Sequence, residues 1–317
     1  MCNKLIHENF ILNFPHTRYQ QSIHFFDNKK DEKFLIQIND SEGNIKLSGI
    51  VFLRKSDNGK CKLYCPRGPI FDECDIKYFR DFLIKAEEIA KQYNASKIIC
   101  NPLVSNKCEG YLKNLGCEII NDPIKTMLPP NEISVKANNE KQMLAQMSKS
   151  CRKNIRKAIS YGLHSEEIEN IDSFDLNKFY ELYVKTMQRK SLSIHNKQHF
   201  KEFLTNMDKR CLRFNKTTIE GEVVAMSIDY VYNRVLECIY SVSNSMYNDK
   251  KANNMLHWGR MLYCINSKDI DYFLCGGVYC DGNDISNKDY GVYQFKSSLC
   301  GGKIKTYIGD IIYNFKR

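Results

Sequence analysis

The sequence predicts an α/β protein with mixed (α+β) sheets, arranged as two tandem domains. Its 317 residues exceed the size at which a single hydrophobic core usually stops growing. Short apolar runs that read as strands alternate with segments of helical period, which is typical of a mixed α/β layer. The order of elements in the first half is roughly repeated in the second, which indicates a duplicated fold. We therefore expect a first domain over residues 1–146 and a second over residues 147–317.

The first half reads as a small antiparallel sheet followed by helix, strand, helix and strand. Turn-rich segments separate the early strands. The stretch Pro66-Arg67-Gly68-Pro69 then breaks the sheet, because proline cannot donate to a strand ladder. The expected strands are 34–39, 46–54, 61–65, 97–100 and 117–120, and the expected helices are 75–93 and 108–115.

The strongest helix pattern covers residues 140–161, which we read as one basic amphipathic helix at the start of the second domain. Gly162 supplies its C-terminal stop. One side carries cations and no acid, so neighbouring charges repel by about 0.2–0.5 kcal/mol per pair. The face is either a solvated surface or a binding surface for phosphate groups. The apolar side holds Leu144, Met147, Cys151, Ile155 and Ala158, and the cationic side holds Lys149, Arg152, Lys153, Arg156 and Lys157.

The second half repeats the plan of helices, antiparallel strands, a helix and a closing strand. Tight turns at Glu220-Gly221 and Asn233-Arg234 separate its three central strands. The expected strands are 163–168, 211–219, 222–232, 235–242, 272–275 and 304–313, and the expected helices are 174–187, 199–207, 255–265 and 293–299.

Composition narrows the class of protein and of partner. A hydrophobic content of 43% and an aromatic content of 12% suit packed cores and argue against disorder. The net charge of +10 suits a polyanionic partner such as RNA, a nucleotide sugar or an anionic membrane surface. No apolar run approaches the about 18 residues of a membrane span, and the N-terminus does not read as a signal peptide, so we expect a cytoplasmic protein.

The cysteines and histidines do not predict a metal site. The 14 cysteines are scattered through apolar segments of a chain without a signal peptide, so they read as reduced core residues. No pair forms the C-x-x-C spacing of a zinc site. His195 and His199 have helical i, i+4 spacing but no third ligand nearby in the sequence. We expect no metal.

The stretch from Tyr272 to Gly302 is the strongest candidate for a functional site. It contains the pair Gly276-Gly277 at the end of a strand, where a ligand can approach the backbone closely. Phe295 and Lys296 follow in a short helical segment, which places a cation near the open end of that strand. The alternative is a surface lysine on a turn packed against the core.

Eight stretches, in order, resemble the FemABX family of peptidoglycan-bridge aminoacyltransferases. They cover about 250 residues of the chain, and none is diagnostic alone. The stretches are YCPRGPIFD (64–72), MSKSCRKNIRKAISYGL (147–163), FYELYVKTMQRK (179–190), IYSVS (239–243), MLHW (255–258), FLCGGV (273–278), GVYQFKSSLCGG (291–302) and TYIGDI (306–311).

The resemblance implies two GNAT-like (acyltransferase-like) α/β domains. It also implies transfer of an amino acid from aminoacyl-tRNA to an amine of a peptidoglycan precursor, either UDP-linked or lipid-linked, with possible peripheral membrane contact. No cofactor is implied beyond aminoacyl-tRNA as co-substrate. Many family members carry a coiled-coil arm in the second domain. Between Tyr161 and Cys211 this sequence has no heptad run of that length, so it resembles the compact, armless type.

The resemblance also assigns residues to roles. Lys296 matches the lysine of the family's Phe-Lys motif and is expected to contact the aminoacyl end or the developing negative charge. Phe295 is expected to stack on the terminal adenine or to pack the site. Asp72 is expected either to accept a proton from the attacking ammonium or to serve as a turn or cap residue.

Further residues are assigned to substrate binding. Arg189 follows the family's Leu-Tyr-x-x-Thr pattern, and its guanidinium suits a diphosphate. Tyr240 lies at the tyrosine position of the matching strand and either contacts substrate or is an ordinary strand aromatic. Arg152 and Arg156 suit RNA or the pyrophosphate, and Gly276 with Gly277 suits close approach of a ligand.

Two other functions stay open at this point. The first is an acyl-CoA N-acyltransferase of the same superfamily, although the segment 249–254 lacks the glycines of a pyrophosphate-binding loop. The second is a non-catalytic RNA-binding protein, which the basic helix alone would support but which leaves the Phe-Lys motif unexplained.

Overall fold

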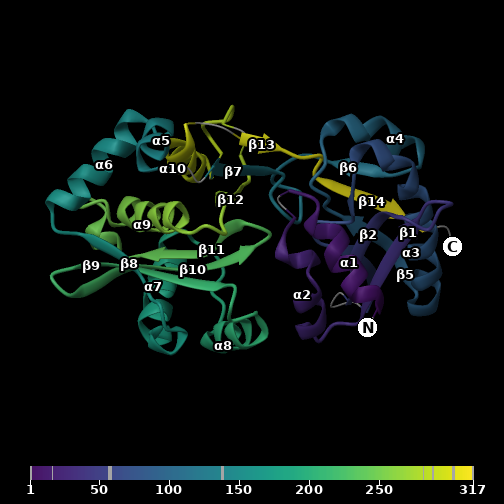
Figure 1. Cartoon of the computed structure of the whole chain (residues 1–317), viewed down its shortest axis with the longest axis horizontal. Helices are drawn as coiled ribbons and strands as arrows, with labels where there is room; N and C mark the ends of the chain where they lie inside the picture. Colours follow the sequence, from purple (N-terminus) through teal and green to yellow (C-terminus); the bar gives the residue numbers. More distant parts are fainter. Residues whose placement is uncertain are drawn as a thin grey trace. The chain divides into compact units, whose positions relative to one another are not determined.

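The computed structural model describes residues 2–15, 17–55, 59–136, 139–280, 282–287, 289–301 and 304–315. The chain forms two compact units, each with its own sheet (Figure 1). The first unit consists of Met1–Asn131, Gly277–Asp289 and Lys305–Arg317, and the second of Glu132–Gly276 and Tyr290–Ile304.

The two units interleave along the sequence, whereas we expected contiguous domains divided at 146/147. The chain returns to the first unit after Gly276 and again after Ile304. The reason is long-range strand pairing: β14 (Asp310–Asn314) pairs antiparallel with both β5 (Ala95–Cys100) and β6 (Glu118–Ile120). A local apolar pattern indicates that a strand forms but not which sheet it joins.

The first sheet has the order β1-β2-β3-β5-β14-β6, with β4 paired to β2. All five strands expected in the first half are present. Strands β3 and β5 are parallel and are joined through α3 (Phe79–Tyr93), which buries Phe79, Phe82 and Ala86 against the core. The remaining strands are β1 (Lys33–Asn39), β2 (Ile45–Lys55), β3 (Cys61–Cys65) and β4 (Ile70–Phe71).

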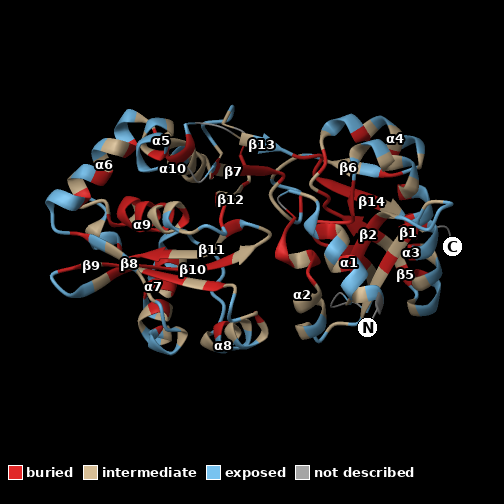
Figure 2. Cartoon of the chain, in the orientation of Figure 1, coloured by how far each residue is buried: buried red, intermediate tan, exposed pale blue. Residues whose placement is uncertain are grey.

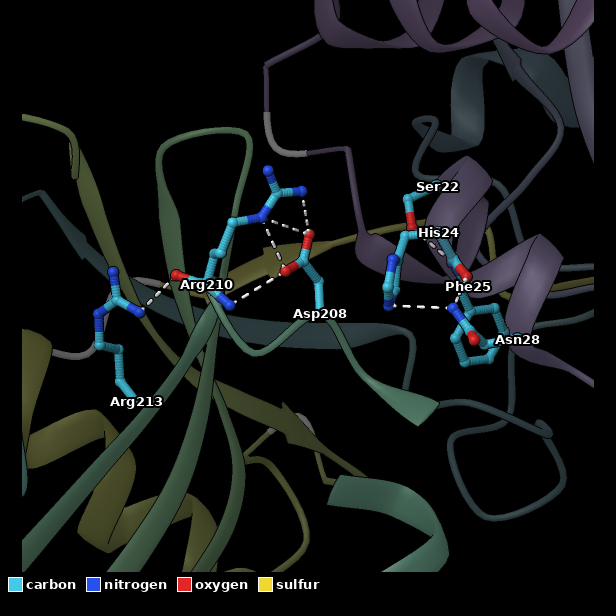
Figure 3. Close-up of polar contacts among 7 residues, drawn as sticks. All are labelled: Ser22, His24, Phe25, Asn28, Asp208, Arg210 and Arg213. Atoms are coloured by element: carbon cyan, nitrogen blue, oxygen red, sulfur yellow. Dashed lines mark hydrogen bonds and ion pairs between the residues drawn. The ribbon is translucent and has the colours of Figure 1, made fainter. Parts of the chain in front are cut away.

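Helical segments that the sequence pattern did not predict precede this sheet. Ser22 caps one of them by accepting a hydrogen bond from the Phe25 backbone N–H, and Asn28 contacts the ring and the carbonyl of His24 (Figure 3). The helical elements of the first unit, besides α3, are α1 (Cys2–Leu12), η1 (Tyr19–Gln21), α2 (Ile23–Asn28), η2 (Glu73–Tyr78), η3 (Asn106–Cys108) and α4 (Glu109–Asn114).

His7 of α1 is fully buried and joins three parts of the first unit. Its Nε2–H donates to the carbonyl of Gln21 over 2.7 Å, so its Nδ1 accepts from the hydroxyl of Ser48, 2.6 Å away on β2. Burial lowers the pKa of His7 to about 4, against a weaker opposing effect of the Gln21 bond. The fold therefore holds a neutral imidazole with both ring nitrogens satisfied.

The second sheet has the order β13-β7-β12-β11-β10-β9-β8. Strands β8 to β11 are antiparallel neighbours, and β11 and β12 are parallel. The turn before β9 is held by Arg210, whose guanidinium donates to the carboxylate of Asp208 (Figure 3). The strands are β7 (Asn131–Lys136), β8 (His164–Glu167), β9 (Leu212–Ile219), β10 (Glu222–Tyr232), β11 (Val235–Ser243), β12 (Tyr272–Val278) and β13 (Ile304–Thr306).

The closing strand expected at 304–313 is two strands, which corrects that prediction. β13 belongs to the second sheet and β14 to the first. Gly309 lies between them with φ +89°, a conformation that interrupts an extended chain. Strand β7 was not predicted from the sequence.

Helices cover both faces of the second sheet: α7 and α8 lie below it and α9 above it in Figure 1. Residues 161–211 are all described, and the longest helix among them is α7 with 14 residues, so this segment contains no coiled-coil arm. The helical elements are α5 (Glu140–Gln146), α6 (Lys149–Ser160), η4 (Ile171–Ser173), α7 (Leu176–Arg189), α8 (Lys197–Asn206), η5 (Ser245–Tyr247), α9 (Ala252–Asn266) and α10 (Tyr290–Cys300).

The helix expected at 140–161 is also two helices, α5 and α6. Met147 and Ser148 between them are extended, and Ser148 caps α6 by accepting a hydrogen bond from the Cys151 backbone N–H over 3.1 Å. The predicted sides of α6 are otherwise observed, since Cys151, Ile155 and Ala158 are buried while Lys149, Lys153 and Arg156 are exposed (Figure 2). The apolar periodicity of the sequence continues across Met147 and Ser148, so the pattern did not reveal the break between the two helices.

Within the described ranges, none of the helices has the length and apolar character needed to cross a bilayer.

We predict that Gly309→Ala destabilises the protein more than Gly43→Ala does. Both glycines have positive φ, +89° and +88°, so both variants carry backbone strain of about 1 kcal/mol. At Gly309 an added Cβ would also lie 2.3 Å from the Ile120 carbonyl oxygen, whereas at Gly43 nothing lies within 4 Å. Urea unfolding should show roughly 1–3 kcal/mol of additional loss for Gly309→Ala. Equal losses would contradict the close approach of these two segments.

We predict that His7→Gln makes stability less dependent on pH. The folded pKa of about 4 lies below the ordinary value of 6.5, so between these pH values the unfolded chain binds a proton that the folded chain does not. Wild-type stability therefore falls as the pH drops through this window, by up to about 3 kcal/mol for His7 alone.

Unfolding at pH 7 and pH 4.5 should accordingly show a larger loss for the wild type than for His7→Gln. The control is His164→Gln, because His164 is an exposed histidine on β8. A His7→Gln protein that keeps the full wild-type pH dependence would show that His7 is not the buried neutral group.

Candidate active site

The second unit contains a cavity of about 330 Å³. It lies where the end of α7 meets strands β11 and β12 and helices α9 and α10. Polar and charged side chains converge on it from all five elements. The lining includes Arg189 and Lys190 of α7, Cys238 and Ser241 of β11, His257 of α9, Cys275 of β12, and Phe295 and Lys296 of α10.

Lys296 reaches the cavity over a glycine. Its Nζ lies 3.2 Å from the position that a Cβ of Gly276 would occupy, and Gly276 has φ +90°. A side chain at residue 276 would therefore displace the ammonium. The close approach that the sequence led us to expect at Gly276 is thus made by Lys296 itself.

The surroundings of Lys296 weaken its charged form. Burial is the main cause that lowers the pKa of this ammonium, and the charges of Lys190 and Arg260 lower it further. The thiols of Cys238 and Cys275 act in the opposite direction. A cation in such a desolvated place interacts more strongly with a negative charge than it would in water.

A buried ion pair lies under the same cavity. Arg260 of α9 donates through Nε to Asp229 of β10 over 3.0 Å and through Nη2 to the same carboxylate, and both side chains are fully buried. Ser227 and Asn215 also donate to Asp229, so the carboxylate is well supplied with donors. The Arg260 guanidinium lies 4.8 Å from the centroid of the Phe273 ring.

His257 connects this ion pair to the cavity. Its Nδ1 lies 3.3 Å from Nη1 of Arg260, and its ring centroid lies 5.2 Å from that of Phe295. Burial lowers the pKa of His257 well below its usual value, and the charges of Arg260 and Lys296 lower it further. Sequence reasoning missed these residues, although an arginine inside an apolar helix and an aspartate inside an apolar strand are a signal of buried pairing.

The cavity gathers Lys296, Phe295 and Arg189 from the residues singled out in the sequence. Arg189 is the last residue of α7 and is exposed. The ring of Phe295 is half-buried and lies edge-on to His257 at an interplanar angle of 67°. These three residues are placed together, with Gly276 directly behind Lys296.

The other expected residues do not line this cavity. Asp72 belongs to the first unit and caps η2 by accepting a hydrogen bond from the Cys74 backbone N–H over 2.8 Å. Gly277 packs in the first unit, where an added Cβ would lie 2.5 Å from the Pro129 ring.

Tyr240 lies among the aromatic residues that β11 shares with α7 and α8. Its hydroxyl is 3.1 Å from Nε2 of His199, and its ring centroid is 5.1 Å from that of Phe200. Burial raises the pKa of Tyr240 to about 12. This geometry matches the strand-aromatic alternative considered for Tyr240.

The two arginines of α6 differ in their contacts. Arg152 turns back and donates to the carbonyls of Leu144 and Met147 at the end of α5, which satisfies groups that the helix break leaves open. Arg156 is exposed together with Lys149 and Lys153. The exposed cations of α6 thus remain available to a polyanion, whereas Arg152 has a structural contact.

The rings of His195 and His199 stack 4.2 Å apart. Groups of three or more His, Cys, Asp or Glu side chains arranged to hold a metal ion are not found in the described part of the chain. Gly302 lies outside the described residues.

The chain was compared with protein-family profiles, curated protein sequences and solved structures. The sequence profile of the FemAB family matches residues 130–219 and 213–317. No curated protein sequence matches the chain. Among solved structures, one described as the crystal structure of FemX is similar with a TM-score of 0.85 at 16% identity, covering 98% of this chain and 96% of that chain.

Two further structures share the fold at lower similarity. The C-terminal domain of a putative lysylphosphatidylglycerol synthetase from Agrobacterium fabrum has a TM-score of 0.58 at 12% identity, covering 99% of this chain and 92% of that chain. A tandem GNAT protein from the clavulanic acid biosynthesis pathway has a TM-score of 0.56 at 9% identity, covering 99% of this chain and 94% of that chain. The expected tandem GNAT-like α/β fold is confirmed. The profile matches more than half of the chain, which therefore belongs to the FemAB family.

Proposed function

We propose that this protein transfers an amino acid from aminoacyl-tRNA to an amine of a peptidoglycan precursor, forming a bridge or side branch. Membership in the FemAB family supports a peptidoglycan-bridge aminoacyltransferase, and the tandem GNAT-like fold supports an acyltransferase. The observation that carries the proposal is the cavity of the second unit, where Lys296 lies against Gly276 beside Phe295, His257 and Arg189.

The proposed transfer requires that the enzyme position the amine against the ester carbonyl and stabilise the negative charge that develops on the carbonyl oxygen. The precursor amine attacks the ester carbonyl carbon, a C–N bond forms, the C–O bond to the tRNA ribose breaks, and the amine proton passes to solvent or to the leaving oxygen. An aminoacyl ester is already activated, so no covalent nucleophile or cofactor is required. In this proposal Lys296 stabilises the negative charge on the carbonyl oxygen.

The remaining roles follow from charge and place. Arg189, exposed at the rim of the cavity, suits the diphosphate of a UDP-linked or lipid-linked precursor. Lys149, Lys153 and Arg156 on α6 suit the tRNA backbone. The proposal places the reaction in the cytoplasm, with peripheral membrane contact if the acceptor is lipid-linked.

The test mixes the purified protein with charged tRNAs and a UDP-muramyl pentapeptide and looks by mass spectrometry for product that has gained one amino-acid residue. Ribonuclease treatment should remove that product. Product that survives ribonuclease and forms with acyl-CoA would instead make the protein an acyl-CoA-dependent N-acyltransferase. RNA binding without any transfer would favour the non-catalytic alternative.

We predict that Lys296→Ala and the nearly isosteric Lys296→Met each lower kcat/KM for transfer at least about 100-fold, because the cation beside the reacting carbonyl is lost. Binding of tRNA, measured by filter retention, should change little. Lys185→Ala is the matched control, since Lys185 is exposed on α7 and pairs with Glu181 outside the cavity. Unchanged turnover in Lys296→Met would remove Lys296 from the mechanism.

We also predict that Lys153→Glu combined with Arg156→Glu weakens tRNA binding about tenfold or more at low salt and makes the dependence of log K on log salt less steep by about 2. The control reverses the same amount of charge elsewhere, at the exposed residues Lys91 and Lys113 of the first unit. If both double variants lose affinity equally, the effect comes from net charge and α6 is not the contact surface.

A further inference from the structure

A line of three buried polar side chains ends at the cavity, and the proposed reaction has not yet used it. Asp229 and Arg260 are fully buried, and His257 is 3% exposed. Arg260 joins the other two, because its Nε and Nη2 donate to Asp229 and its Nη1 lies 3.3 Å from Nδ1 of His257. Only His257 of the three lines the cavity.

The contact with Arg260 fixes the tautomer of His257. A guanidinium has donors but no acceptor, so Nδ1 must present a lone pair to Nη1. In a neutral imidazole the proton then sits on Nε2. Arg260 is itself held in place by the Asp229 carboxylate and by the Phe273 ring.

The charged groups around His257 also keep it neutral. Protonation would place a third positive charge beside Arg260 and Lys296, on a ring that is buried. No described residue makes a hydrogen bond with Nε2 of His257. Nε2 is also not one of the fully buried side-chain atoms that lack a partner, so it is not sealed inside the core. Its N–H is therefore directed to the space of the cavity that the ring lines.

We propose that the Nε2–H of His257 donates a hydrogen bond to the carbonyl oxygen of the aminoacyl group bound in the cavity, as a second donor beside Lys296. This inference rests on the proposed function. Asp229 and Arg260 are positioning residues that hold the imidazole neutral and oriented. No proton is transferred by His257, because a ring nitrogen that carries a proton and faces the substrate acts as a donor and not as a general base.

The kinetic test compares His257→Asn with His257→Gln. Asparagine keeps an acceptor near the position of Nδ1 for Arg260 but has no donor near the position of Nε2. Glutamine keeps an N–H near the position of Nε2.

Removing one donor to a developing oxyanion lowers kcat by roughly 100- to 1000-fold. We expect His257→Asn to lose about 100-fold in kcat with little change in KM, and His257→Gln to keep activity within about tenfold of the wild type. His164→Gln, at an exposed histidine of β8, should match the wild type.

Equal kcat losses in the two His257 variants, together with a lowered Tm in both, would mean that His257 only packs the core. A His257→Asn protein with wild-type kcat would likewise overturn the proposal.

The second measurement does not depend on activity. In NMR spectra of the ¹⁵N-histidine-labelled wild-type protein, the ring signals absent from His257→Gln belong to His257. They should show a neutral ring with the proton on Nε2 from pH 8 down to pH 6.5, the ordinary pKa of a histidine. A ring that is half-protonated at pH 6.5, or one protonated on Nδ1, would overturn the inference. A wild-type protein that transfers nothing but shows the neutral Nε2–H form would instead refute the proposed function while leaving the imidazole geometry intact.

Discussion

The buried ion pair between Asp229 and Arg260 is the interaction on which the second unit depends. Two charges removed from water are tolerated only when they meet each other with good geometry and further hydrogen bonds, and here Ser227 and Asn215 supply those bonds. Loss of one partner would leave an uncompensated buried charge, at a cost of roughly 3–5 kcal/mol. The pair therefore fixes how α9 lies over β10, and with α9 it fixes His257 at the cavity. Figure 2 shows that α9 is buried along most of its length, whereas α6 is largely exposed.

Space for the lysine is the second constraint. Helix α10 directs Lys296 over β12 at Gly276, where an added Cβ would lie 3.2 Å from Nζ and would crowd it. Gly301, with φ +69°, ends the same helix where an added Cβ would lie 2.4 Å from the Gln146 carbonyl oxygen of α5. The glycines of this stretch thus serve the placement of a cation and the packing of its helix.

Much of the fold was predictable because local patterns determine it. The amphipathic stripe of α3, most strands of both sheets and the buried side of α6 follow from apolar periodicity, whereas β4 and β7 were missed and β13 and β14 were predicted as one strand. The break at Met147 and Ser148 was missed because the apolar periodicity runs through it. Ser148 was the available signal, since serine is a preferred N-cap residue. The return of β14 to the first sheet, between β5 and β6, depends on pairing between residues 190 to 217 positions apart in the sequence, which a local pattern does not reveal.

The site was predictable to a different degree. Lys296, Phe295 and Arg189 were singled out by family resemblance together with the glycine-rich stretch, and the structure brings them to one cavity. Asp72 and Tyr240 instead make contacts that fit their structural alternatives. The Asp229, Arg260 and His257 line was missed because its members are 28 residues or more apart from strand to helix, and their pairing exists only after α9 packs on the sheet.

The most direct measurement is a crystal structure with a stable amide analogue of the 3′-aminoacyl adenosine end of tRNA. The account predicts the aminoacyl carbonyl oxygen within hydrogen-bond distance of Lys296 Nζ in the cavity of the second unit. An analogue bound elsewhere, with that cavity empty or closed by side chains, would contradict it.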